Sequence, residues 1–173
     1  MQQIVIIFSA FFVLRLMSLY ISIKNEKRLK LMGAVQYGKL NSLLLTLAHI
    51  AYYFCALYEA YTSGVSFNNY SAIGAVVIAF SYIMLFYVIY KLRDVWTVKL
   101  YIAPNHRIEK SFLFRVVRHP NYILNIIPEL IGVALLCNSW NTMMYGLPIY
   151  CCVLLVRIVQ EERAMKGLFS KAA

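Results

Sequence analysis

The sequence has few of the residues that divide a chain into soluble domains and loops. Only four of its 173 residues are proline and seven are glycine, and no stretch is rich in proline, glycine or serine. Acidic residues are equally scarce, at seven against 17 lysines and arginines, which gives a formal net charge of +10. There is no internal repeat. These absences predict a single domain over residues 1–173.

Several catalytic motifs are also absent. The scattered glycines form neither a GxGxxG nor a Walker motif, which excludes the common glycine-rich nucleotide loops. No HExxH motif or Cys/His cluster offers a metal site, and no GxSxG elbow offers an acyl nucleophile. The cysteines have no ligand or disulfide spacing and are expected to be small core residues: Cys55, Cys137, Cys151 and Cys152. Group transfer from a bound donor is the chemistry that remains.

Apolar residues, by contrast, are abundant. They make up 62% of the chain, against about 45–50% in soluble domains, and the mean hydropathy is +0.67. The pattern predicts an all-α integral membrane protein with five transmembrane helices, each near the 20 or so residues that span a bilayer. Only Ser139–Asn141 separate the last two, which predicts a tight antiparallel hairpin. The spans are expected over residues 4–23, 41–63, 71–92, 122–138 and 142–159.

The first span is not expected to be a cleaved signal peptide, because it lacks a basic start and its one arginine, Arg15, falls late. Of the 17 basic residues, 16 lie in three regions: 24–40, 91–121 and from 157 onward. Five spans would bring these regions to one face, which the positive-inside rule makes cytoplasmic, with the N-terminus outside and the C-terminus inside. Membrane lipids, not nucleic acid, are then the expected partners of the charge.

Two ionisable residues fall inside the predicted spans. Glu129 lies about 12 Å inward from the cytoplasmic end of its span, and His49 has a similar depth in the second span. Such groups are costly in lipid and are functional candidates by default. The two could form a hydrogen-bonded pair, either as a structural link or as part of the substrate site. Glu59, near the outer end, could simply reach the interface.

A denser set of polar residues lies at the cytoplasmic edge. His119 and Tyr122 share a helix face, as do Arg157 and Glu161, and Pro120 suits a first helical turn. An antiparallel hairpin would bring the four polar residues to one pocket, with the linker after residue 90 as a lid. Taken singly, such residues are usually snorkelling or solvated. Together they suit a zwitterionic cofactor, since acids can hold an ammonium or ribose hydroxyls and an arginine can hold a carboxylate or enolate.

The motifs "RHPNY" (Arg118–Tyr122) and "RIVQEE" (Arg157–Glu162) flank the apolar hairpin. With the loop Asn25–Gly38 and the His49-to-Glu59 spacing, the chain resembles short bacterial members of the isoprenylcysteine carboxyl methyltransferase family. The resemblance implies a bacterial cell membrane protein with a five-helix core. It also implies that S-adenosylmethionine (SAM) binds between the last two helices and the cytoplasmic linker.

The resemblance also assigns residues to roles. Arg157 would face the anionic group of the substrate, and Glu161 would hold SAM. The "HRIE" strip matches a cofactor strip of the family, and Phe114 takes the place of a tyrosine that stacks on adenine. The expected cofactor residues are His106, Arg107, Ile108, Glu109, Phe114, Arg118, His119, Pro120, Asn121, Tyr122 and Glu161.

Three departures from the family concern the adenine side. "FLF" (Phe112–Phe114) replaces a Gly-x-Tyr sequence, Glu109 replaces an apolar residue, and Lys99 stands where a neutral polar residue is expected. The expected activity is O-methylation of an acidic, lipid-like substrate entering from the bilayer, such as an alkylpyrone, another polyketide or a prenylcysteine-type carboxylate. Neither a metal nor a nucleic acid is expected to take part. The alternatives are phospholipid N-methylation and a non-catalytic membrane protein that retains the fold.

Overall fold

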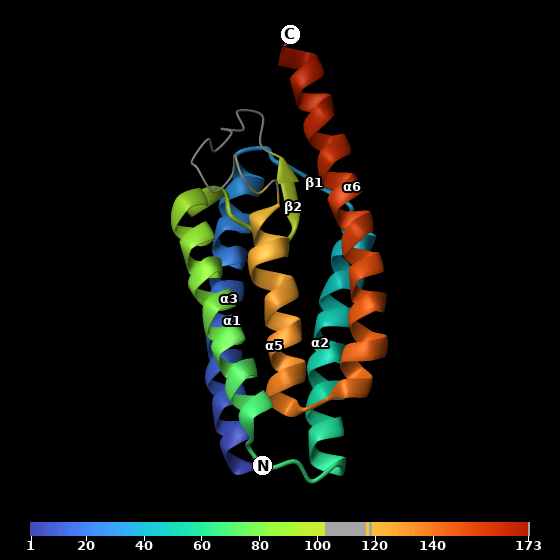
Figure 1. Ribbon diagram of the computed structural model, residues 1–173. Coiled ribbons are helices and arrows are strands. Elements are labelled where there is room, and N and C mark those ends of the chain that lie inside the picture. The colour runs from blue at the N-terminus through green and yellow to red at the C-terminus, as the bar shows by residue number, and fades with distance from the viewer. Residues whose placement is uncertain (103–116, 118, 173) are drawn as a thin grey trace.

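The chain forms an all-α bundle. The computed structural model describes residues 1–102, 117 and 119–172, with side chains up to residue 164. Successive helices run in opposite directions, so the two termini lie at opposite ends of the bundle (Figure 1). The helices are α1 (Gln2–Leu31), α2 (Lys39–Thr62), α3 (Asn69–Leu92), α5 (Ile127–Cys137) and α6 (Leu147–Ala172).

Most of the helices are built for a lipid environment. Helices α1, α2 and α3 and the segment Thr142–Ala164 are long and apolar enough to cross a membrane. Only 11% of the most apolar window of α1 is buried inside the molecule, so lipid must cover the rest. Asn121–Cys137 is apolar but has no more than 17 residues. Four candidate spans are therefore present in the described chain, and the predicted count of five is not confirmed.

Proline shapes the start of the last two helices. The π-helical segment η2 (Asn121–Ile126) leads into α5, and η3 (Thr142–Gly146) leads into α6. Each wide turn ends two residues before a proline, Pro128 or Pro148. Proline has no N–H to donate, and its ring presses on the carbonyl four residues back. A π turn relieves both problems, which explains why these helices do not begin as regular α-helices.

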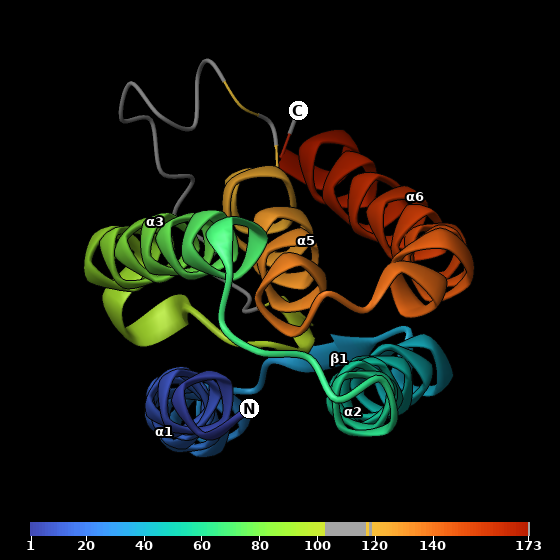
Figure 2. The ribbon, with the colours of Figure 1, turned by 60° about the horizontal axis from the view of Figure 1, so that its bottom comes forward.

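Helix α5 lies at the centre of the packing. It packs most extensively against α3, while α6 packs mainly against α2 (Figure 2). The connection from Asn138, which adopts a left-handed conformation at φ 50°, is as short as the sequence indicates. Because the two helices have different main partners, the predicted hairpin packing is not confirmed.

Two short strands, not expected from the sequence, lie at one end of the bundle. Strand β1 (Val35–Tyr37) pairs antiparallel with β2 (Leu100–Ile102), with Val35 opposite Ile102. They lie near the end of the bundle toward which the C-terminus points, which we call the strand end (Figure 1). The described parts of the three basic regions also lie toward this end. That grouping agrees with the charge pattern, while the cytoplasmic assignment of this end stays a prediction.

Candidate functional site

Four polar side chains meet between η2 and α6 at the strand end. The Tyr122 hydroxyl donates to Glu161 Oε2 at 2.7 Å, and Arg157 Nε donates to the same hydroxyl at 3.4 Å. The His119 ring stacks on Tyr122, with centroids 5.7 Å apart, and its Nδ1 lies 3.6 Å from Glu161 Oε1. We call His119, Tyr122, Arg157 and Glu161 the Arg157 cluster. The four residues that the sequence predicts to converge do so.

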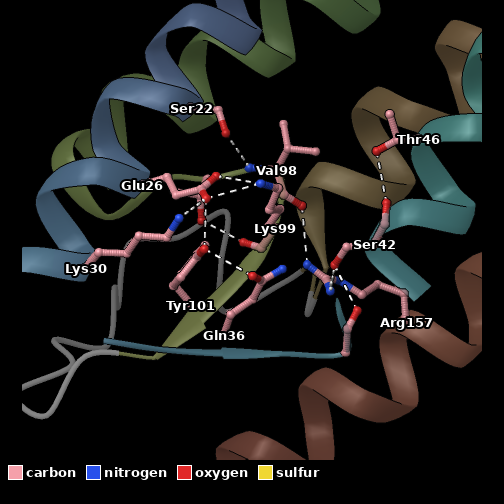
Figure 3. A network of polar contacts seen from close by, with 12 residues as sticks. Ser22, Glu26, Lys30, Gln36, Ser42, Thr46, Val98, Lys99, Tyr101 and Arg157 are labelled. Carbon is pink, nitrogen blue, oxygen red and sulfur yellow. Dashed lines mark hydrogen bonds and ion pairs between the residues drawn. The ribbon is translucent and has the colours of Figure 1, made fainter. Parts of the chain in front are cut away.

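The guanidinium of Arg157 is almost fully buried, with 2% of the residue exposed. Its Nη1 donates to Ser42 Oγ at 3.0 Å and its Nη2 to the Val98 carbonyl at 3.2 Å (Figure 3). Within the described part of the chain, no carboxylate lies at ion-pair distance from it. A buried charge without a counter-ion is costly. Neutral oxygens hold this guanidinium in place but leave room for an anion among its five donors.

Several polar atoms around the cluster have no hydrogen-bond partner among the described residues. They are His119 Nδ1 and Nε2, Asn121 Oδ1 and Gln160 Oε1. The Glu161 and Glu162 carboxylates lie 3.6 and 3.7 Å from the ring, and interaction with Glu161 above all raises the pKa of His119 above 6.5. Buried donors and acceptors without partners are rare in native proteins. They fit a ligand with amino, carboxylate and hydroxyl groups, as SAM has.

Pro120, also predicted to line the cofactor site, is buried and follows His119 directly in the chain. The other predicted cofactor residues lie outside the described residues: His106, Arg107, Ile108, Glu109, Phe114 and Arg118.

A second polar group supports Arg157 from the side of α1. Glu26 accepts hydrogen bonds from Lys99 Nζ at 3.1 Å and from the Tyr101 hydroxyl at 2.9 Å, and it pairs with Lys30 at 2.7 Å (Figure 3). Burial, reinforced by the bond to Glu26, raises the pKa of Tyr101. Lys99, noted in the sequence only as a family departure, therefore ties β2 to α1. The neighbouring Val98 is fixed as well, and its carbonyl holds Arg157.

Glu129 is fully buried in the middle of the bundle. Its Oε1 accepts from the hydroxyls of Tyr53 and of Tyr82, the latter at 2.8 Å, and its Oε2 lies 3.3 Å from Arg15 Nη1. His49 Nε2 lies 3.9 Å from Oε1, too far for the hydrogen bond that the sequence suggests. We call these five residues the Glu129 cluster.

Three members of the Glu129 cluster are not predicted from the sequence. The position of Arg15 inside an apolar span is the signal that could have identified it. Tyr53 lies one turn after His49, a spacing that places both on one helix face. Nothing in the sequence singled out Tyr82 among 14 tyrosines.

Glu59 caps the start of η3 instead of reaching solvent alone. Its Oε1 accepts from Asn141 N at 2.9 Å, and its Oε2 accepts from Thr142 N at 2.9 Å and Thr142 Oγ1 at 2.8 Å. A carboxylate at the start of a helix satisfies free N–H groups and complements the helix dipole. Among the described residues, no group of three or more His, Cys, Asp or Glu could hold a metal ion.

Comparison with known proteins bears directly on this arrangement. Residues 72–167 match the model of the isoprenylcysteine carboxyl methyltransferase (ICMT) family. This match covers more than half of the chain and contains His119, Tyr122, Arg157 and Glu161. The chain belongs to the ICMT family. It is therefore a membrane methyltransferase, and ICMT enzymes use SAM.

Two relatives span nearly the same length as this ICMT chain. A protein of Haemophilus influenzae (strain ATCC 51907 / DSM 11121 / KW20 / Rd), described as uncharacterized, is 55% identical over 96% of this chain and 97% of its own. The uncharacterized protein YpbQ of Bacillus subtilis (strain 168) is 24% identical over 83% of this chain and 84% of its own. No solved structure matches.

Proposed function

We propose that the chain transfers the methyl group of SAM to an acidic oxygen of a lipid-like acceptor at the strand end of the bundle. The observation that carries this proposal is the buried Arg157 guanidinium, which neutral oxygens orient and no described carboxylate neutralises. The acceptor is a prenylcysteine-type carboxylate or the acidic hydroxyl of an alkylpyrone or other polyketide. It enters from the bilayer, which the exposed apolar faces of the helices contact.

SAM supplies a methyl group on a sulfonium, which is a good leaving group. His119, Pro120, Asn121, Tyr122 and Glu161 would hold it. Oδ1 of Asn121, which has no hydrogen-bond partner among the described residues, supports this assignment because it needs a ligand donor. Glu161 provides negative charge in the cluster, as an ammonium or ribose hydroxyls require.

Arg157 would bind and orient the acceptor anion. An acceptor that is already ionised at neutral pH needs no general base, so the chain's contribution is alignment and exclusion of water. Alignment alone can supply several kcal/mol of the barrier reduction. The Tyr122 hydroxyl, which accepts from Arg157 and donates to Glu161, links the acceptor side to the cofactor side. A neutral phospholipid amine would gain nothing from Arg157, so we favour an oxygen acceptor over N-methylation.

Calorimetric titration of SAM tests the cofactor residues. We expect His119→Ala and Glu161→Ala to weaken SAM binding, because each removes a polar partner. Arg157→Lys should bind SAM as the wild type does, since it keeps the charge but loses the planar fork that matches a carboxylate. Unchanged SAM affinity in both the His119 and Glu161 variants would defeat the assignment.

Activity itself requires the acceptor. The purified protein is incubated with labelled SAM and a host lipid extract, and mass spectrometry searches for a product heavier by one methyl group. We expect the wild type to form such a product and Arg157→Lys to need more acceptor for the same rate. A wild-type protein that binds SAM but methylates no lipid would contradict the proposed function and favour a non-catalytic role.

A further inference from the structure

Polar side chains lead from the Arg157 cluster into the middle of the bundle. Three helical stretches each carry one polar residue at the Arg157 cluster, the outer level, and another in the middle of the bundle, the inner level. The two residues of each pair are seven positions apart. In the α-helices α2 and α6, seven residues are close to two turns, or about 10 Å, so both residues face the same side. The third stretch includes the π turn η2, and contacts place its two residues: Tyr122 lies beside Arg157 and Glu129 beside His49. The pairs are Ser42 and His49 on α2, Tyr122 and Glu129 on η2–α5, and Arg157 and Tyr150 on α6.

Three polar atoms at the inner level lack a hydrogen-bond partner among the described residues. They are His49 Nε2, Asn125 Oδ1 and Glu129 Oε2, and the last of these still has its ion pair with Arg15. Asn125 is fully buried and His49 is 9% exposed. His49 Nε2 lies 3.9 Å from Glu129 Oε1, and Asn125 lies in η2, four residues before Glu129. An unpaired buried polar atom is costly, so His49 Nε2 and Asn125 Oδ1 need a partner that the described protein groups do not provide.

The charges at this level indicate what kind of partner fits. Glu129 and Arg15 compensate each other at 3.3 Å, and two tyrosine hydroxyls complete the carboxylate. The described residues of the inner level therefore carry no surplus charge. A neutral group that can both donate and accept hydrogen bonds suits His49 and Asn125, whereas an ion would be left without compensation.

We infer that His49 and Asn125 bind a neutral hydroxyl or amide group of the acceptor, about 10 Å from the anion held by Arg157. This inference rests on the proposed function and narrows its substrate. An acceptor whose chain is hydrocarbon about 10 Å from its acidic group, such as a simple prenylcysteine, offers nothing to these two residues. An acceptor with a second oxygen or nitrogen along its chain engages both levels.

The test compares acceptor kinetics in variants of the inner level. The lipid that the wild type methylates from a host extract is identified by mass spectrometry and then used as the substrate. His49→Phe and Asn125→Leu remove the hydrogen-bonding atoms, while His49→Gln keeps one. Tyr52→Phe on the same helix is the matched control, because its hydroxyl donates to the Leu130 carbonyl at 3.1 Å and not to this group.

We expect the accepted lipid to carry a hydroxyl or amide beyond the methylated oxygen. His49→Phe and Asn125→Leu should raise the KM for that lipid about tenfold with little change in kcat, as the loss of one hydrogen bond predicts. His49→Gln should recover most of the affinity, and the control should match the wild type. The SAM affinity of each variant, measured by calorimetry, shows whether it is folded.

Two results overturn the inference while the proposed function stands. One is a methylated lipid with no such group, and the other is an unchanged KM in folded variants, which would leave only a water molecule or a structural role for these atoms. If His49→Phe and Asn125→Leu both lose SAM binding, their KM values no longer test the inference. The presence or absence of a hydroxyl or amide in the methylated lipid then decides it. A wild type that methylates nothing defeats the proposed function, and this inference with it.

Discussion

Two buried charges in the bundle are satisfied in different ways. Glu129 has a counter-ion, Arg15, and two tyrosine hydroxyls inside the protein. Among the described residues, Arg157 is hydrogen-bonded only to neutral oxygens, those of Ser42, Tyr122 and Val98. A compensated pair fixes helices relative to one another, whereas an oriented but uncompensated charge is arranged to receive an ion. This difference distinguishes the proposed anion site at Arg157 from the internally compensated polar group at Glu129.

Removing Arg15 should strongly destabilise the bundle. In Arg15→Met the Glu129 carboxylate stays buried without its counter-ion, at a cost of about 3–5 kcal/mol. The double variant Arg15→Met/Glu129→Gln removes both charges and should recover most of that loss. Arg28→Met is the control, because it breaks the exposed pair with Asp94 at 2.7 Å and should cost under about 1 kcal/mol. Thermal unfolding in detergent measures the wild type and the three variants, and a double variant no more stable than Arg15→Met would contradict the pairing.

The His119 interaction should make stability depend on pH. Its pKa is raised above 6.5, chiefly by Glu161 and further by Glu162. Protonated His119 therefore stabilises the folded chain fully below pH 6.5, and this contribution disappears as the pH rises through the raised pKa. We expect His119→Gln to melt below the wild type at about pH 6 and close to it at about pH 9. A difference that grows toward alkaline pH would reverse the assignment.

At the scale of elements, hydropathy predicts the long helices but not the strands or the π turns. The four long spans were predictable, because apolar runs near 20 residues have few alternatives in a membrane. The strands were not, since three residues are too short for alternation to show. The two π turns depend on how Pro128 and Pro148 distort particular turns. The Arg157 cluster could be predicted because its members lie at fixed helical spacings, whereas Arg15 joins Glu129 only through the packing of α1.

The contact between α3 and α5 depends on glycine. A Cβ added to Gly74 would meet the backbone N of Leu136 and lie 2.7 Å from the Gly132 carbonyl oxygen. Neither backbone atom can move without shifting α5. We expect Gly74→Ala to destabilise the bundle by about 1–3 kcal/mol. Ala72→Val, on an exposed position of the same helix, adds more volume without a clash and should melt like the wild type. Equal melting temperatures for both variants would exclude this close approach.

At the scale of the whole molecule, the apolar surface and the distribution of basic residues together bear on how the bundle is oriented in the membrane. Apolar side chains cover the outside of the helices, and the described basic regions lie toward the strand end with the Arg157 cluster. We therefore predict that the strand end lies on the cytoplasmic side, because lysines and arginines are retained there. The proposed function requires the same orientation, since SAM is made inside the cell.

Cysteine labelling in intact cells tests that orientation. In a background with the four native cysteines replaced by alanine, we expect Ser66→Cys, in the turn between α2 and α3, to react with a membrane-impermeant maleimide. Lys27→Cys, exposed near the strand end, should react only after the membrane is permeabilised. Restoring Cys55, which is exposed along α2 between the two ends, provides a control that stays unlabelled in both conditions because lipid covers it. The reverse pattern, with Lys27→Cys labelled from outside, would place the Arg157 cluster on the face without SAM and contradict both the orientation and the proposed reaction.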